Sequence, residues 1–89
     1  MSHTKVIIIG AGGHAAEIEE YIQYNNKVDS LENVEIVGLI DDNPANYEHY
    51  AFVAPYLGPI KGHVLDESAY YVMGIANLAY RKPIIENFI

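Results

Sequence analysis

A run of branched apolar residues that breaks into a glycine-rich turn constrains this chain most. Val6 to Ile9 is short, apolar and β-branched, and three of the next four residues are glycine. An amphipathic segment from Ala15 to Tyr24 follows almost at once. This order predicts a buried parallel strand, a tight turn and a helix whose N-terminus points over the turn. Because free backbone N–H groups and the positive end of the helix dipole meet there, we expect an anion site at the turn.

The length and charge of the chain limit its classes of function. Its 89 residues allow one small domain, 1–89, and 51% of them are hydrophobic, which suffices for a core. The net charge of −7 leaves no basic stripe, so nucleic acid is excluded as a partner and a phosphate must be held by local donors. No cysteine is present, which excludes disulfides and thiolate metal sites. No signal segment or membrane-inserting apolar run is found, so we expect a soluble, cytoplasmic protein.

The order of apolar runs predicts the fold class. Strands are expected at 5–9, 36–40 and 69–73, a helix at about 13–24 that ends at Asn25-Asn26, and a last helix at about 78–88. This order is typical of an α/β fold, here a small Rossmann-like three-layer domain with a parallel sheet of three to four strands. Between the strands, 45–55 is interpreted as irregular. Loop packing is the interpretation for the tyrosines of this region, with stacking on a base as the alternative: Tyr47, Tyr50 and Tyr56. On the first helix, three acidic residues are expected to face water, namely Glu17, Glu19 and Glu20.

Three segments follow strands and meet at one edge of such a sheet, where ligands bind: 10–14, 41–43 and 74–77. In the first, Gly10, Gly12 and Ala15 fit the pattern G-x-G-x-x-A. The two glycines allow a tight turn and the close approach of a ligand, and a small third residue lets the helix pack on the strand. A purely structural glycine turn is the alternative.

Asp41 and Asp42 end the second strand, where dinucleotide-binding folds place a carboxylate for ribose hydroxyls. A carboxylate there can also accept an N–H from a pyrimidine ring. The alternative is an Asx-turn before Pro44. Since one aspartate suffices for a turn, we expect a ligand role for at least one of the pair.

His14, Asn77 and Arg81 are the other polar candidates. His14 lies in the glycine turn, so it is a candidate for contact with a phosphate or sugar and for an assisting role as a proton carrier. Its alternative is a capping or solvent-facing side chain. Asn77 can cap the last helix or touch the ligand. Arg81 is interpreted as solvated, with contact to a phosphate as the alternative. Without a Ser-His-Asp group or a metal-spaced His pair, no catalytic residue and no metal site are predicted.

Together, four segments resemble the N-terminal domain of the sialic-acid O-acetyltransferase and UDP-amino-sugar acetyltransferase family (NeuD and PglD type): 5–14, 36–42, 57–60 and 74–77. The resemblance implies a domain that binds a UDP-type sugar nucleotide in glycan biosynthesis. Carried over by position, the turn of Gly12, Gly13 and His14 meets the sugar and the phosphates. By the same resemblance, Asp41 and Asp42 bind the uridine and Ala76 lies beside them. Gly10 and Asn77 are the remaining residues of the expected substrate-binding set. The family often has glycine where this chain has Ala76.

Members of that family continue into a left-handed β-helix of hexapeptide repeats. The resemblance implies that this second domain forms a homotrimer, binds acetyl-CoA and supplies a catalytic histidine. The sequence ends at Ile89 without such repeats. We therefore expect a substrate-binding domain that holds no cofactor and transfers no acyl group alone. Two alternatives stay open: a fragment of an NAD(P)-binding Rossmann oxidoreductase, with Asp41 on the adenosine ribose, and a non-catalytic interaction domain without a ligand.

Overall fold

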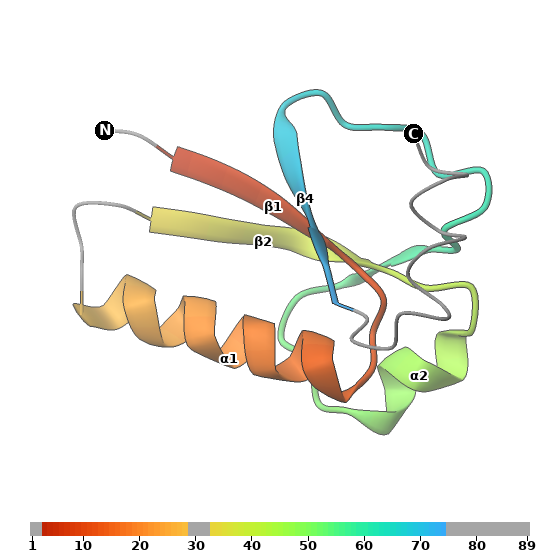
Figure 1. Ribbon diagram of the computed structural model, residues 1–89, viewed down its shortest axis with the longest axis horizontal. Helices are drawn as coiled ribbons and strands as arrows, with labels where there is room; N and C mark the ends of the chain where they lie inside the picture. The colour runs from red at the N-terminus through yellow and green to blue at the C-terminus, as the bar shows by residue number, and fades with distance from the viewer. Residues whose placement is uncertain (1–2, 29–32, 75–89) are drawn as a thin grey trace.

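The computed structural model describes residues 3–28 and 33–74, which form a four-stranded sheet with two helices (Figure 1). Along the chain these are β1 (His3–Ile9), α1 (Gly13–Val28), β2 (Asn33–Ile40), α2 (Pro44–His49), β3 (Tyr56–Gly58) and β4 (Ala69–Met73). The strand order is β3-β2-β1-β4 and every pair is parallel. The predicted α/β class and Rossmann-like parallel sheet are confirmed. The helix predicted at 78–88 lies outside the described residues.

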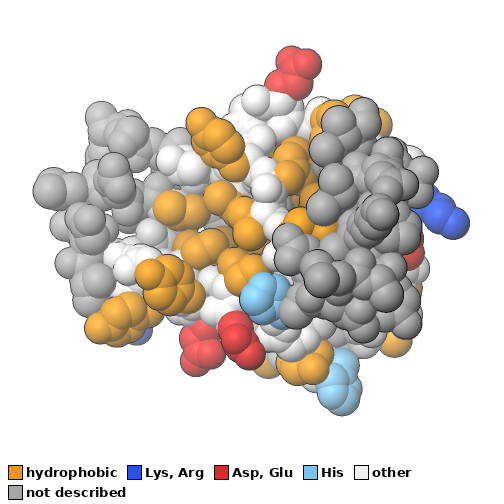
Figure 2. All heavy atoms as spheres, viewed as in Figure 1, with side chains coloured by type: hydrophobic (Ala, Val, Ile, Leu, Met, Phe, Trp, Pro, Cys, Tyr) orange, Lys and Arg blue, Asp and Glu red, His pale blue; other side chains and the backbone are white. Residues whose placement is uncertain are grey.

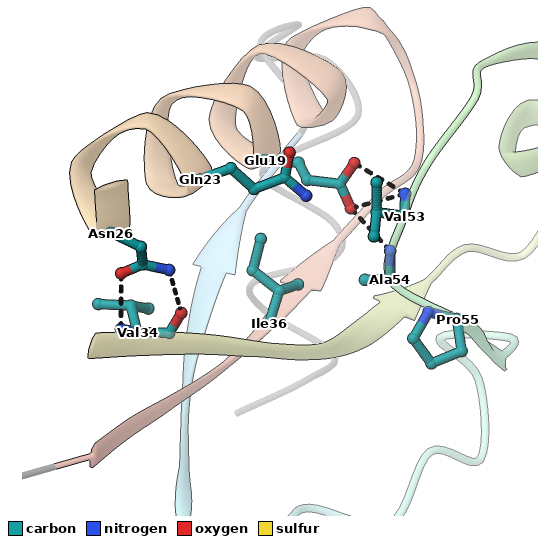
Figure 3. Close-up of a pocket in the computed structure, with 8 residues that line it drawn as sticks. All are labelled: Glu19, Gln23, Asn26, Val34, Ile36, Val53, Ala54 and Pro55. Carbon is teal, nitrogen blue, oxygen red and sulfur yellow. Dashed lines mark hydrogen bonds between the residues drawn. The ribbon is translucent and has the colours of Figure 1, made fainter. Parts of the chain in front are cut away.

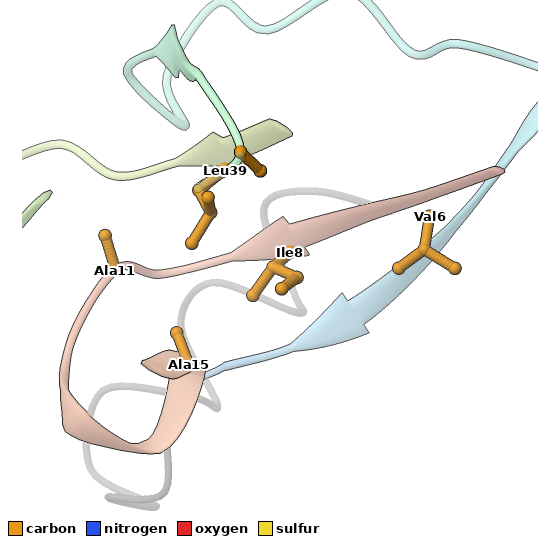
Figure 4. Packing of buried hydrophobic residues seen from close by; sticks show 6 residues of the cluster. Val6, Ile8, Ala11, Ala15 and Leu39 are labelled. Carbon is orange, nitrogen blue, oxygen red and sulfur yellow. The ribbon is translucent and has the colours of Figure 1, made fainter. Parts of the chain in front are cut away.

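β1 is buried on both of its faces, as its unbroken apolar sequence predicts. Ile8 is 0% exposed and belongs to the cluster on the side of α1, whereas Ile7 is 1% exposed and belongs to the opposite cluster. Figure 4 shows the first cluster, in which Ile8 lies among Val6, Leu39, Ala11 and Ala15. Ile18 of α1 and Tyr47 of α2 pack against the same cluster, so both described helices contribute to this side of the sheet.

The prediction that α1 ends at Asn25-Asn26 is wrong, because the helix continues to Val28. Asn26 uses its side chain to bind β2 instead of breaking the helix. Its Oδ1 accepts from the N–H of Val34 at 2.9 Å, and its Nδ2 donates to the carbonyl of Val34 at 2.8 Å. The end of α1 is thereby tied to the start of β2.

The expectation that Glu19 faces water is also wrong, whereas Glu17 and Glu20 are exposed as predicted. Glu19 is 5% exposed, and its carboxylate accepts from the backbone N–H groups of Val53 at 3.0 Å and Ala54 at 2.9 Å. A buried carboxylate is tolerated where such donors replace water. Glu19 therefore fixes the loop before β3 against α1 (Figure 3).

Part of the segment predicted to be irregular forms the short helix α2. Asn43 caps it, since its Oδ1 accepts from the N–H of Ala45 at 3.1 Å, and Pro44 takes the first helical position. Tyr47 donates to the carbonyl of Ala54 at 2.7 Å and stacks on Phe52 with ring centroids 5.4 Å apart. The tyrosine is thus loop packing, as predicted.

β4 matches the strand predicted at 69–73, and an ordered turn precedes it. Asp66 accepts from the hydroxyl of Ser68 at 2.6 Å and from its N–H at 2.9 Å. The two bonds hold the pKa of Asp66 below its usual value, and the bond from the Ser68 hydroxyl has the larger effect.

Candidate functional site

The carboxyl ends of the strands are joined by backbone hydrogen bonds at one end of the sheet. The N–H of Gly10 donates to the carbonyl of Ile40 at 2.6 Å, and the N–H of Gly74 donates to that of Ile9 at 2.7 Å. The start of α1 and the whole of α2 lie at this same end (Figure 1). The described part of the three predicted segments, 10–14, 41–43 and Gly74, is therefore brought together.

The glycine turn leaves room and hydrogen-bond donors above the start of α1. Gly10 has a φ of 98°, a left-handed conformation that favours glycine, so the turn is tight. A Cβ added to Gly12 would meet no atom of the described residues within 4 Å. The amides of Gly12, Gly13 and His14 donate to no acceptor among the described residues, and the His14 side chain is exposed. Such N–H groups at a helix start suit an anion.

Close packing beneath the turn explains the small residue at its third motif position. Ala15 is 0% exposed, and a Cβ built on Gly74 would lie 2.8 Å from the Cβ of Ala15 and 2.7 Å from Cγ2 of Ile8. A larger side chain at either position would push α1 away from the sheet. The prediction that a small residue at position 15 lets the helix pack on the strand is confirmed.

Asp41 joins the glycine turn to α2. It is 8% exposed, and its Oδ2 accepts from the N–H of Ala11 at 2.9 Å while its Oδ1 accepts from that of Asn43 at 2.8 Å. The side-chain amide of Asn46 adds contacts to both oxygens at 3.3 and 3.2 Å. The bond to Asn43 is that of an Asx-turn, so the structural use considered for the Asp-Asp pair is present.

Asp42 keeps an oxygen available. The side chain is exposed, and its Oδ1 accepts from the N–H groups of Ile60 at 2.9 Å and Lys61 at 3.0 Å. Its Oδ2 accepts no hydrogen bond from the described residues. Of the two carboxylates, Asp42 is the one with room for an additional donor.

A separate hollow of about 300 Å³ lies between α1, β2 and the loop before β3 (Figure 3). Asn26 and Glu19 line it, and their side chains already bind Val34 and the 53–54 backbone. No predicted site residue lines this hollow. In the part of the chain that is described, no group of three or more His, Cys, Asp or Glu side chains could hold a metal ion, and no helix is long and apolar enough to cross a membrane.

In a comparison with known protein families, residues 5–88 match the PglD N-terminal domain. The chain belongs to this family. The PglD N-terminal domain is the N-terminal domain of a sugar acetyltransferase family, which confirms the resemblance described above. Comparisons with curated proteins and with solved structures gave no match.

Within this PglD N-terminal domain, Ala76 and Asn77 lie outside the described residues, and their site roles stay predictions. Asn46 and Tyr50 reach the site from α2 and the residue after it. Asn46 was not predicted to be there, and Tyr50 was interpreted as loop packing, with stacking on a base as the alternative. One sequence signal could have predicted the place of Asn46. Asn43-Pro44 is a cap residue followed by proline, which indicates the start of a helix, and a helix that starts there brings Asn46 close to Asp41.

Tyr56 is the titratable residue through which the stability of the domain at this site depends on pH. Its hydroxyl donates to the main-chain carbonyl of Asp41 at 2.6 Å. Partial burial raises the pKa of Tyr56, and the negative charges of Asp41 and Asp42 raise it further. A tyrosine whose pKa is higher in the folded than in the unfolded protein stabilises the fold while it is protonated. This stability is fully present below the pKa of the unfolded state, about 10 for tyrosine, and is lost as pH rises through the folded-state pKa.

We therefore expect the urea midpoint of this PglD N-terminal domain to fall above about pH 10, and to fall less in Tyr56→Phe. Circular dichroism followed between pH 7 and about 11 measures both curves. Tyr24→Phe is the control, since Tyr24 is 64% exposed on α1. Parallel pH curves for Tyr56→Phe and the unaltered chain would contradict the assignment.

Proposed function

We propose that this domain binds a nucleotide-activated sugar of the UDP type across the glycine turn and Asp42. The observation that carries the proposal is the set of amides at Gly12, Gly13 and His14, which have no acceptor among the described residues; no described atom lies within 4 Å of a Cβ built on Gly12. Membership of the PglD N-terminal domain family supports a sugar-acetyltransferase context.

The diphosphate is assigned to the glycine turn. The amides there are neutral donors, and the N-terminus of the 16-residue helix α1 adds a partial positive charge. In a chain with a net charge of −7, these local donors supply the attraction that the whole molecule does not. Exposed His14 borders the turn and is assigned to the sugar or phosphate.

The uridine is assigned to Asp42 because its Oδ2 can accept a ring N–H or a ribose hydroxyl. Asp41 supports the site by a different route, since its carboxylate already binds Ala11, Asn43 and Asn46. The hydrogen bond from the N–H of Ala11 to Asp41 connects the glycine turn, assigned to the diphosphate, with the end of β2, assigned to the uridine.

In the complete enzyme, the bound sugar presents a hydroxyl or amine to an acyl group. We assign acetyl-CoA and the homotrimer contacts to the hexapeptide-repeat domain that such enzymes carry, and no described residue of this chain is assigned to acetyl-CoA. The role of this domain is to bind and orient the acceptor sugar.

Titration of the isotope-labelled chain with UDP-N-acetylglucosamine tests the binding. We expect amide shifts confined to 10–14 and 41–42 at millimolar ligand, and weaker shifts with NAD at equal concentration. No shift in these segments with any UDP-sugar would reject the proposal. A stronger response to NAD would favour the oxidoreductase alternative, and concentration-dependent size without any nucleotide response would favour an interaction domain.

The matched control is Gly12→Ala. The added methyl group meets no atom of the described residues, so the fold should be kept, but it fills the place assigned to the ligand. We expect an unchanged amide spectrum without ligand and weaker shifts with it. Equal shifts in Gly12→Ala and the unaltered chain would move the ligand away from this turn.

A further inference from the structure

The phenol of Tyr50 lies over the first residue of α1. A Cβ built on Gly13 would lie 3.2 Å from Oη of Tyr50 and 3.6 Å from its Cζ. Tyr50 follows α2 in the sequence, so the ring reaches the glycine turn from the end of α2. Gly13 is thereby the residue that lets the ring approach.

Neighbouring rings hold Tyr50 in this place. Its ring packs edge-on to His49 with centroids 4.9 Å apart and to Phe52 with centroids 6.1 Å apart. The side chain is 38% exposed, and its hydroxyl makes no hydrogen bond with any described residue. A fixed ring with an unused hydroxyl donor therefore stands beside the unpaired amides of the turn.

The described basic residues are Lys5, Lys27 and Lys61, and of these Lys61 lies next to the nucleoside side of the proposed site, where its backbone N–H donates to Asp42 at 3.0 Å. Lys27 lies in the last turn of α1, about 20 Å from Gly13 at the rise of an α-helix. Lys5 pairs with Ala69 at the start of β4, well before the carboxyl end of the sheet. On the face drawn in Figure 2, the basic side chains that are described show only at the margins. At Gly13 itself, the donors that the described residues place beside the turn are backbone N–H groups and the Tyr50 hydroxyl.

We propose that Tyr50 is a phosphate-contacting residue that donates its hydroxyl to the diphosphate of the bound sugar nucleotide and selects for phosphate-bearing ligands. This assignment rests on the proposed function. The amides of Gly12 and Gly13 approach the diphosphate from the start of α1, and the Tyr50 hydroxyl approaches it from the end of α2. Its ring separates the phosphates from solvent on that side.

Tyr50→Phe tests the hydroxyl while it keeps the ring. We expect the dissociation constants of UDP and UDP-N-acetylglucosamine to rise roughly tenfold, the low end for a hydrogen bond to a charged group. The dissociation constant of uridine, which has no phosphate, should not change. Calorimetry at constant salt measures all three ligands, with Tyr24→Phe as the control on α1.

Each other outcome has a defined meaning. Equal losses for UDP and uridine, no loss for UDP, or tighter UDP binding in Tyr50→Phe would overturn the assignment while leaving the proposed function intact. If the unaltered chain binds neither UDP nor the UDP-sugar, the proposed function fails first, and the assignment fails with it. Inorganic pyrophosphate provides a further arm, because its own dissociation constant should also rise in Tyr50→Phe; an unchanged value would contradict the assignment.

Discussion

Asp41→Asn should lower the free energy of unfolding by about 3 kcal/mol, because a buried carboxylate with several donors becomes an amide. The amide keeps one accepting oxygen, so either Ala11 or Asn43 loses its acceptor, and the new NH₂ group faces a donor. Ala11 is 0% exposed, so water cannot replace the lost bond there. Since a domain has about 5–15 kcal/mol in all, this loss is a large share.

Urea unfolding followed by circular dichroism measures the difference, with the m-value as a check on two-state behaviour. Asp42→Asn is the matched control. Its remaining oxygen can still accept from Ile60 and Lys61, so stability should stay within about 0.5 kcal/mol, whereas UDP-sugar binding should weaken. Equal midpoints for Asp41→Asn and the unaltered chain would show that the Asp41 carboxylate is not needed to hold the turn.

Gly38→Ala is expected to be the second severe substitution, with a loss of about 3 kcal/mol. The new Cβ would lie 2.4 Å from Cγ of Leu57 and 2.7 Å from the carbonyl oxygen of Pro55. Leu57 is 42% exposed and can turn away, but that carbonyl accepts from the N–H of Leu39 at 3.0 Å. Relief of the clash therefore requires β3 to move away from β2.

The double variant Gly38→Ala with Leu57→Ala separates the two contacts. Removal of the leucine should restore only a part of the stability, because the backbone contact remains. Gly12→Ala makes the same chemical change where no described atom lies within 4 Å, and it should leave the urea midpoint nearly unchanged. Full recovery in the double variant would assign the cost to Leu57 alone.

The sheet was predictable because its signals are local. β1 and β4 are apolar runs bounded by turn residues, and the glycine turn separates β1 from α1 in the sequence itself. Family membership was likewise predictable from motifs that span nearly the whole chain.

The partners of polar side chains were not predictable in the same way. Glu19 has the spacing of an exposed residue, and its burial depends on a loop 34 residues later that packs on α1. α2 spans only 6 residues, too few for its apolar pattern to stand out from a loop. The free oxygen of Asp42 and the position of Tyr50 likewise follow from tertiary contacts.

Asn26 also blocks part of an open edge of the sheet. Among the described strands, β3 pairs with β2 only at Leu39 and Ile40, so the first half of β2 is an open sheet edge on that side. Such edges recruit strands from other molecules and lead to aggregation. The Asn26 amide occupies both the N–H and the carbonyl of Val34, so an incoming strand would have to displace it before pairing there.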